Sequence, residues 1–117
     1  MNSTTSGGSR RLILTAMIFA VAMTFIDQRA EAQQAGLDLR ETTLVLFGSP
    51  AAGTPVMAAS PLAALDLPLK ILVWADEGQT KVSYYSPAAL AARHHLDADL
   101  GRNLAGIDAL TDALVAP

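Results

Sequence analysis

The chain has 117 residues, of which 51% are hydrophobic, 16% charged and 5% aromatic. This apolar share excludes an intrinsically disordered chain, and the length allows one small domain. The absence of cysteine excludes disulfide scaffolds, thiolate metal sites and cysteine nucleophiles. The net charge of -3 argues against nucleic acid as a partner, because nucleic-acid-binding domains carry a basic face.

The N-terminal segment differs from the rest of the chain. Two consecutive arginines precede an uncharged, mostly apolar run over residues 12–26, and a small-x-small sequence ends at Ala32. This order is typical of a secretory signal with cleavage after Ala32, and the paired arginines are typical of a twin-arginine export signal. We therefore divide the chain into a signal peptide or membrane anchor, residues 1–32, and a domain, residues 33–117.

Two other interpretations of this segment stay open. One is an uncleaved membrane anchor over residues 10–26, although a spanning helix needs about 20 apolar residues. The other is an artefact of gene fusion or start-site assignment. Residues 11–28 resemble the first transmembrane helix of drug-exporting major facilitator superfamily transporters, in which an aspartate such as Asp27 closes the helix. A single helix cannot form a transporter, so we infer no transport activity.

Strand signals dominate the middle of the chain. Residues 42–47 are β-branched and apolar, and their continuous apolar character predicts that both faces of this strand are covered. Residues 69–75 and 80–85 are also expected to be strands. Between them, residues 76–79 form the turn of a hairpin, in which Gly78 supplies the positive φ.

The segment between the first two of these strands is expected to be irregular. Residues 48–55 predict a loop, because they contain two glycines and two prolines. Residues 54–60 predict an irregular strand or a turn of helix. A compact connector over residues 61–68 is expected to be anchored by three leucines: Leu62, Leu65 and Leu67.

Helices are expected at the C-terminal end. Ser86 as N-cap and Pro87 at the first helical position predict a helix that runs through His94. Asp97 is expected to cap one final helix with an apolar stripe at helical spacing. Because strands come first and helices last, we predict an α+β fold with a small antiparallel sheet, preceded by an apolar N-terminal helix. The stripe consists of Leu100, Leu104, Ile107, Leu110 and Leu114.

Several sequence blocks occur in the order found in the bacterial domain-of-unknown-function 302 family, which the chain resembles from about residue 25 to residue 115. The resemblance implies a small α+β domain with helices on one face of an antiparallel sheet, a layout similar to the TATA-binding-protein-like fold. It also implies homodimers, but no reaction. The matching blocks are Phe47-Gly48-Ser49-Pro50, Gly53-Thr54-Pro55-Val56-Met57, Leu65-Asp66-Leu67-Pro68-Leu69-Lys70, Val73-Trp74, Val82-Ser83-Tyr84 and Leu90-Ala91-Ala92-Arg93-His94.

Two departures from the family pattern concern the N-terminal segment. Members usually begin with a strand and a helix before the part that matches Phe25 onward, and the apolar run stands in their place here. The family often has an Asp-His pair where this chain has Asp27-Gln28. Because the imidazole is missing, the resemblance does not support a metal-binding or proton-transfer role for this pair. Cleavage after Ala32 would remove Asp27 and leave part of the sheet uncovered, which predicts a marginal fold rescued by dimerisation.

Four side chains are candidates for a ligand site: Lys70, Asp66, Arg93 and His94. Lys70 precedes an apolar strand, where it either meets an anionic ligand or extends to solvent and pairs with Asp66. His94 follows Arg93 at a helix end, where an imidazole can ligate a metal, act as a general base or cap the helix C-terminus. Adjacent His95 points about 100° away from His94 on a helix, so the two cannot converge on one ion.

No converging catalytic set is recognisable, and we expect no cofactor and no bound metal. We predict a non-catalytic binding or interaction module that forms homodimers. It is expected to be periplasmic or anchored in the inner membrane through residues 10–26, or cytoplasmic if the N-terminal segment is an artefact. The alternative is a metal- or anion-dependent enzyme that uses His94, Asp66 and Lys70. The aromatic residues Trp74, Tyr84 and Tyr85 are expected in the core or at a dimer surface.

Overall fold

The computed structural model describes residues 22–115, which form an α+β domain around a four-stranded antiparallel sheet. The predicted fold class is therefore confirmed. The strands are β1 (Ala22–Asp27), β2 (Thr42–Gly48), β3 (Leu69–Asp76) and β4 (Gln79–Ser83), which lie in this order across the sheet. The helices are α2 (Gln28–Gln34), α3 (Pro50–Ala59), the 3-10 helix η2 (Pro61–Leu65), α4 (Pro87–Arg93), α5 (Ala98–Arg102) and α6 (Gly106–Val115).

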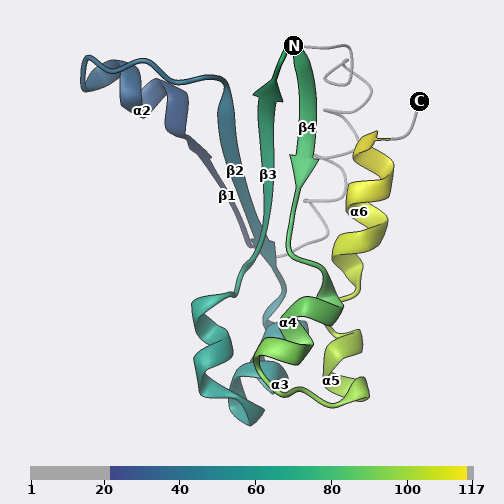
Figure 1. The fold of residues 1–117 in the computed structure, drawn as a ribbon. Helices are drawn as coiled ribbons and strands as arrows, with labels where there is room; N and C mark the ends of the chain where they lie inside the picture. The colour runs from purple at the N-terminus through teal and green to yellow at the C-terminus, as the bar shows by residue number, and fades with distance from the viewer. Residues whose placement is uncertain (1–21, 116–117) are drawn as a thin grey trace.

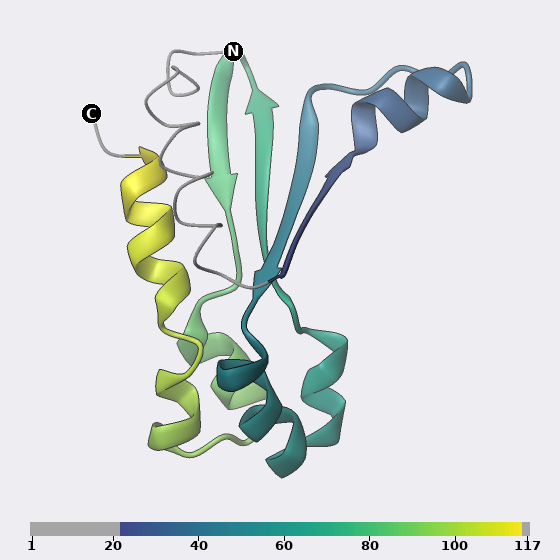
Figure 2. The ribbon, with the colours of Figure 1, turned by 180° about the vertical axis from the view of Figure 1, so that it is seen from behind.

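Most of these helices gather at one end of the sheet. Figures 1 and 2 show α3, η2, α4 and α5 below the sheet, whereas α6 runs alongside β4 and α2 projects from the opposite end. The chain passes between the sheet and the lower helices after β2, before β3 and after β4. Side chains from distant parts of the sequence can therefore meet at this junction.

The β3–β4 hairpin closes as predicted. Its two central turn residues, Glu77 and Gly78, have φ values of 50° and 81°. Two successive residues with positive φ are the signature of a type I′ turn, whose twist matches that of the flanking strands. This turn sets the hairpin register, in which Asp76 lies opposite Gln79.

One face of the sheet carries the hydrophobic core. Val45 of β2 lies opposite Ile71 of β3, and both side chains are buried on this face. The helices contribute Val56, Leu90 and other apolar residues to the same cluster, as predicted for helices on one face. The buried cluster consists of Val45, Phe47, Val56, Ala63, Leu69, Ile71, Leu90, Leu104 and Ile107.

The opposite face of the sheet is only partly covered. Leu44 and Leu46 alternate with the core residues of β2 and stay partly exposed, as does Leu72, which lies opposite Leu44. The prediction that both faces of residues 42–47 are covered is therefore wrong. The physical reason is that the lower helices extend the sheet from its end and α6 packs with the core face.

Residues 50–59 form helix α3, so the loop predicted for residues 48–55 is wrong, and of the two alternatives for residues 54–60 the helical one agrees with the structure. Ser49 is the N-cap, and its carbonyl oxygen accepts hydrogen bonds from the backbone N–H groups of Ala52 and Gly53 at 3.0 and 2.8 Å. Pro50 occupies the first turn, where its missing N–H costs no helical hydrogen bond. Pro50 thus marks the start of the helix, whereas Pro55 is accommodated within it.

The connector before β3 is anchored differently from our prediction. Leu62 and Leu65 are 69% and 77% exposed, so the expectation that they anchor η2 is wrong. Ala63 is the buried residue of this short helix and belongs to the core cluster, so the face of the 3-10 turn that meets the core carries a small side chain. Leu67 does pack against the core, as predicted.

The C-terminal part forms two helices instead of the one that we predicted. Asp97 caps the first of them, α5, by accepting a hydrogen bond from the Leu100 N–H at 2.9 Å. The chain then turns at Asn103, the C-cap of α5. The Asn103 side chain donates a hydrogen bond to the Ala52 carbonyl oxygen at 3.1 Å and so connects this turn to α3. The predicted stripe continues across the break, since Leu104 and Ile107 are buried. The side chains of residues 110 and 114 lie outside the described ones.

Strand β1 contains the end of the apolar run. Its six residues pair with β2 from Ala22 opposite Gly48 to Asp27 opposite Thr43. The predicted apolar helix is therefore wrong for residues 22–26, and residues 1–21 lie outside the described chain. Asp27 caps α2 by accepting a hydrogen bond from the Ala30 N–H at 2.9 Å. The described chain thus opens with β1 and α2, which belong largely to the part that matches the family from Phe25 onward. The preceding segment, where we expected the apolar run to replace an earlier strand and helix, lies outside the described residues.

Candidate functional site

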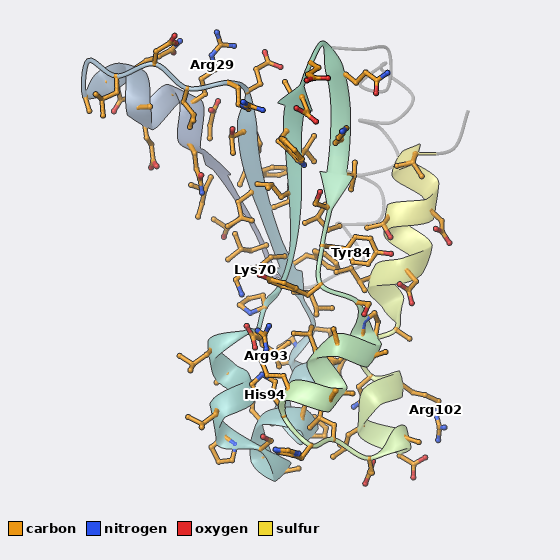
Figure 3. All side chains as sticks on the ribbon, viewed as in Figure 1. Arg29, Lys70, Tyr84, Arg93, His94 and Arg102 are labelled. Atoms are coloured by element: carbon orange, nitrogen blue, oxygen red, sulfur yellow. The ribbon has the colours of Figure 1, made fainter. Side chains whose placement is uncertain are left out.

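Three of the four predicted site residues meet at the junction of the sheet and the lower helices. Asp66 follows η2, and Arg93 and His94 end α4. His94 Nε2 lies 2.6 Å from Asp66 Oδ2, and Arg93 Nη1 donates to Oδ2 at 3.1 Å and to Oδ1 at 3.3 Å. We call these three residues the Asp66 cluster. Figure 3 shows Arg93 and His94 together between the sheet and the helices.

The Asp66 carboxylate is held in its ionised form. The hydrogen bond from His94 is the largest cause that lowers the pKa of Asp66 below its usual value. Hydrogen bonding and charge from Arg93 lower this pKa further, while burial opposes them. An ionised carboxylate only accepts hydrogen bonds, so Nε2 of His94 carries the proton that it donates. The His94 side chain is 9% exposed, which leaves little access for a reactant.

Lys70 lies near this cluster but does not pair with Asp66. Its Nζ donates to the Pro68 carbonyl oxygen at 3.1 Å. Lys70 and Asp66 line a small cavity of about 120 Å³ together with Tyr85 and apolar residues. The interpretation that Lys70 pairs with Asp66 is therefore wrong, and the interpretation that it stands at a cavity agrees with the geometry.

A larger hollow of about 340 Å³ opens beside this cavity on the less covered face of the sheet. Lys70 and Tyr85 line both, so the two spaces adjoin. Arg93 lies over the Tyr85 ring, with its Cζ 5.1 Å from the ring centroid. We call the larger hollow the Lys70 groove. It is lined by Leu44, Lys70, Leu72, Ser83, Tyr84 and Tyr85.

Sequence reasoning did not find most of this groove. Leu44 and Leu72 belong to apolar strands, and nothing in a continuous apolar run marks which residues line an open surface. Tyr84 and Tyr85 were expected in the core or at a dimer surface; Tyr85 is 62% exposed, so it is not a core residue, and the dimer surface stays a prediction. An adjacent tyrosine pair directly after a strand is the signal that could have indicated the groove.

A metal-binding set is not found in the described part of the chain. Across residues 22–115, no three side chains of histidine, cysteine, aspartate or glutamate come together as a candidate metal site. His95 is exposed and has a φ of 55°, which places it beyond the end of α4 and apart from the Asp66 cluster.

Replacing Asp66 by asparagine is expected to lower the free energy of unfolding at pH 7 by about 1–2 kcal/mol, because charged hydrogen bonds to Arg93 and His94 are lost. The folded state lowers the pKa of Asp66, so this stabilisation is complete above about pH 4 and disappears as the pH falls further. Urea unfolding of both proteins at pH 7 and near pH 2.5 measures the difference. Asp76, whose pKa Lys81 also lowers, is present in both proteins and cancels.

The matched control for this prediction is Asp99→Asn. Asp99 also pairs with an arginine, Arg102, but its side chain is 83% exposed, so its replacement is expected to change stability little. An equal loss of stability in the two variants, or a loss in Asp66→Asn that does not become smaller between pH 7 and pH 2.5, would contradict the assignment of an energetically important cluster around Asp66.

Fold and site together define a small α+β domain with an open, partly apolar sheet face. The sequence profile of the family described as "Domain of unknown function DUF302" matches residues 12–114. The chain belongs to this family. Its fold is similar to that of an uncharacterized conserved DUF302 protein from Bacillus stearothermophilus, with a TM-score of 0.69 and 20% identity, over 91% of this chain and 85% of that one. The resemblance of residues 11–28 to a drug exporter finds no support in these comparisons.

Two relatives are 42% identical to this chain over 74 residues, or 62% of its length. They are named fluoride-specific ion channel FluC 1, from Brucella suis biovar 1 and from Brucella abortus biovar 1. The chain spans less than a third of their length, 29% and 27% respectively. Because the matched stretch exceeds half of this chain, it necessarily includes the middle, where α3 and η2 lie.

Proposed function

We propose that this domain is a non-catalytic binding module and that the Lys70 groove is its binding surface. The observation that carries the proposal is the arrangement of the Asp66 cluster. Asp66, Arg93 and His94 bind one another, and His94 is nearly buried. A general base needs a nitrogen within reach of a reactant, so this cluster is better suited to stabilising the junction than to catalysis. The enzyme alternative, with His94 as metal ligand or base, is therefore disfavoured.

The groove itself has the features of a binding surface. Its lining combines apolar side chains with a few polar groups, the composition typical of small-molecule sites. Leu44 and Leu72 come from paired strands and form a rigid floor, since their backbones are fixed by the sheet. The Asp66 cluster holds α4 against η2 and thereby supports Arg93 over Tyr85.

Fluorescence of 8-anilinonaphthalene-1-sulfonate, titrated with the full-length native protein, tests this proposal. We expect saturable binding to the native protein. In Leu72→Ser, the dissociation constant is expected to rise about fivefold, because about 1 kcal/mol of apolar contact is lost. Leu62→Ser is the matched control, since Leu62 is an exposed leucine on η2 outside the groove. Absence of saturable binding, or equal weakening in both variants, would refute the groove as the binding surface.

We also propose that residues 22–32 stay in the mature protein. They supply β1 and most of α2, so cleavage after Ala32 would remove an edge strand from the sheet. A membrane anchor over residues 10–26 would need residues 22–26, which belong to β1 here. Without them, residues 12–21 supply only about half of the apolar length that a spanning helix needs. Among residues 22–115, no helix is both long and apolar enough to cross a membrane. The intact mass of the native product tests this proposal, and a mass that corresponds to a chain starting at Gln33 would contradict it.

Homodimer formation is a further part of the proposed function. Exposed apolar residues outside the groove, Phe25 on β1 and Leu37 and Leu39 after α2, are available to a partner. Exposed apolar patches of this kind mark interaction surfaces. Light scattering coupled to size-exclusion chromatography, over a dilution series of the full-length protein, measures the mass. A monomer at micromolar concentration would count against self-association.

A second candidate function is a domain that accompanies a membrane transport protein, which the similarity to the Brucella proteins favours. In this case the domain senses the transported anion, and fluoride is expected to raise its thermal midpoint more than chloride at equal concentration. The exposed groove argues against tight fluoride binding, since a small, strongly hydrated anion needs an enclosed set of donors. Equal midpoints in the two salts would remove this candidate.

A further inference from the structure

Lys70 differs from the other described lysine and arginine side chains because it has no carboxylate partner. Its Nζ donates to the Pro68 carbonyl oxygen, which uses one of the three ammonium N–H groups. All the other lysine and arginine side chains within residues 22–115 form ion pairs. These pairs are Arg29 with Glu41, Arg40 and Lys81 with Asp76, Arg93 with Asp66, and Arg102 with Asp99.

The position of Lys70 makes this missing partner significant. Lys70 is half-buried and lies opposite Leu46 on the sheet, and Leu72 is the next residue on the same face of β3. The two tyrosines of the groove stand beside it. Figure 3 shows Lys70 at the lower end of the sheet, above Arg93. An ammonium among apolar groups loses part of its hydration, and a counter-ion restores that stabilisation.

The charge balance of the site favours a monoanion. The charge of Arg93 is matched by Asp66, so among residues 22–115 Lys70 contributes the one uncompensated positive charge of the two adjoining spaces. Strong phosphate sites supply several cationic donors. Lys70 alone would neutralise only one of the two charges of a phosphate dianion. The apolar floor of Leu44 and Leu72 supplies contact for a ligand body that is not charged.

We propose that the Lys70 groove binds a small organic carboxylate with an apolar body. The carboxylate accepts hydrogen bonds from Lys70 Nζ, and the apolar body lies along Leu44 and Leu72 beside Tyr84. This inference rests on the proposed function, which assigns binding to the groove, and adds the chemical class of the ligand. It requires no covalent step and no catalytic group.

Calorimetric titration of the full-length protein with 4-phenylbutyrate and with the uncharged 4-phenylbutan-1-ol tests the inference. These two probes share an apolar body and differ in the charged group. We expect the carboxylate to bind about tenfold more tightly than the alcohol, in line with one charged hydrogen bond. Lys70→Met keeps an unbranched stem without the charge, and is expected to make the two affinities equal. Lys81→Met is the matched control, since Lys81 lies outside the groove, paired with Asp76.

Each outcome has a distinct meaning. Equal binding of acid and alcohol to the native protein would overturn the ligand class while the groove stays a binding surface. Binding of neither probe, together with no saturable anilinonaphthalene sulfonate fluorescence, would refute the proposed function as well. Tighter binding of inorganic phosphate or fluoride than of 4-phenylbutyrate would overturn the proposal that the ligand is a monoanion with an apolar body. A dimer that protects Lys70 from acetylation would assign this face to a second copy and overturn the inference.

Discussion

A chain that begins at Gln33 is expected to lose the cooperative unfolding transition of the full-length protein. It lacks β1 and most of α2, so all six residue pairs between β1 and β2 disappear. β2, which carries Val45 and Phe47 into the core, becomes an edge strand that is paired only with β3. A small domain has a total stability of about 5–15 kcal/mol, and loss of one of four strands is expected to exceed it. Circular dichroism during urea and thermal unfolding measures the transition.

The matched comparison is a chain that begins at Ala22, which keeps β1 and α2. A Gln33 chain that unfolds at the same urea concentration as the Ala22 chain would show that β1 contributes nothing to the fold. A Gln33 chain that folds only as a dimer, as measured by light scattering, would support the expectation that dimerisation compensates for the missing strand.

Replacing Ile71 by alanine is expected to destabilise the protein by about 2–5 kcal/mol, because a buried isoleucine leaves a cavity that its neighbours cannot fill. Ile71 is 1% exposed, lies in the central strand β3 and is paired with Val45 on the core face. Urea unfolding at pH 7 gives the change in the free energy of unfolding.

Leu65→Ala is the control for this second prediction. Leu65 is a large apolar residue of the same part of the chain, but it is 77% exposed, so a change within about 0.5 kcal/mol is expected. If the two variants lost the same stability, the position of the core on this face of the sheet would be wrong.

The elements with local signals were predictable from the sequence. The β3–β4 hairpin followed from Gly78, and the start of α4 followed from Ser86, whose hydroxyl accepts a hydrogen bond from the Ala89 N–H. These features depend on residues that are neighbours in the chain, so no tertiary information is needed. By contrast, β1 was missed because a short apolar run fits a strand or a buried helix equally well. Pairing with β2 selects the strand over the helix, and residues 22–27 alone do not predict this pairing.

The candidate site shows the same division. Asp66, Arg93 and His94 were recognisable as polar residues at the ends of elements, but their meeting depends on how η2 and α4 pack. The groove was harder to predict, since Leu72 is one apolar residue among several in β3, and only the arrangement of helices leaves its side of the sheet open. The ion-pair partners of the other cations were needed before Lys70 stood out.

The hydrogen bond between Asp66 and His94 joins residues that are 28 positions apart in the chain. The segment between them contains the whole β3–β4 hairpin, whose tight turn already brings its two flanks together. Once the hairpin has formed, little chain entropy is lost in closing the remaining loop. The topology therefore favours docking of α4 on η2 after the hairpin has formed, because the hairpin shortens the stretch of chain that this contact has to close.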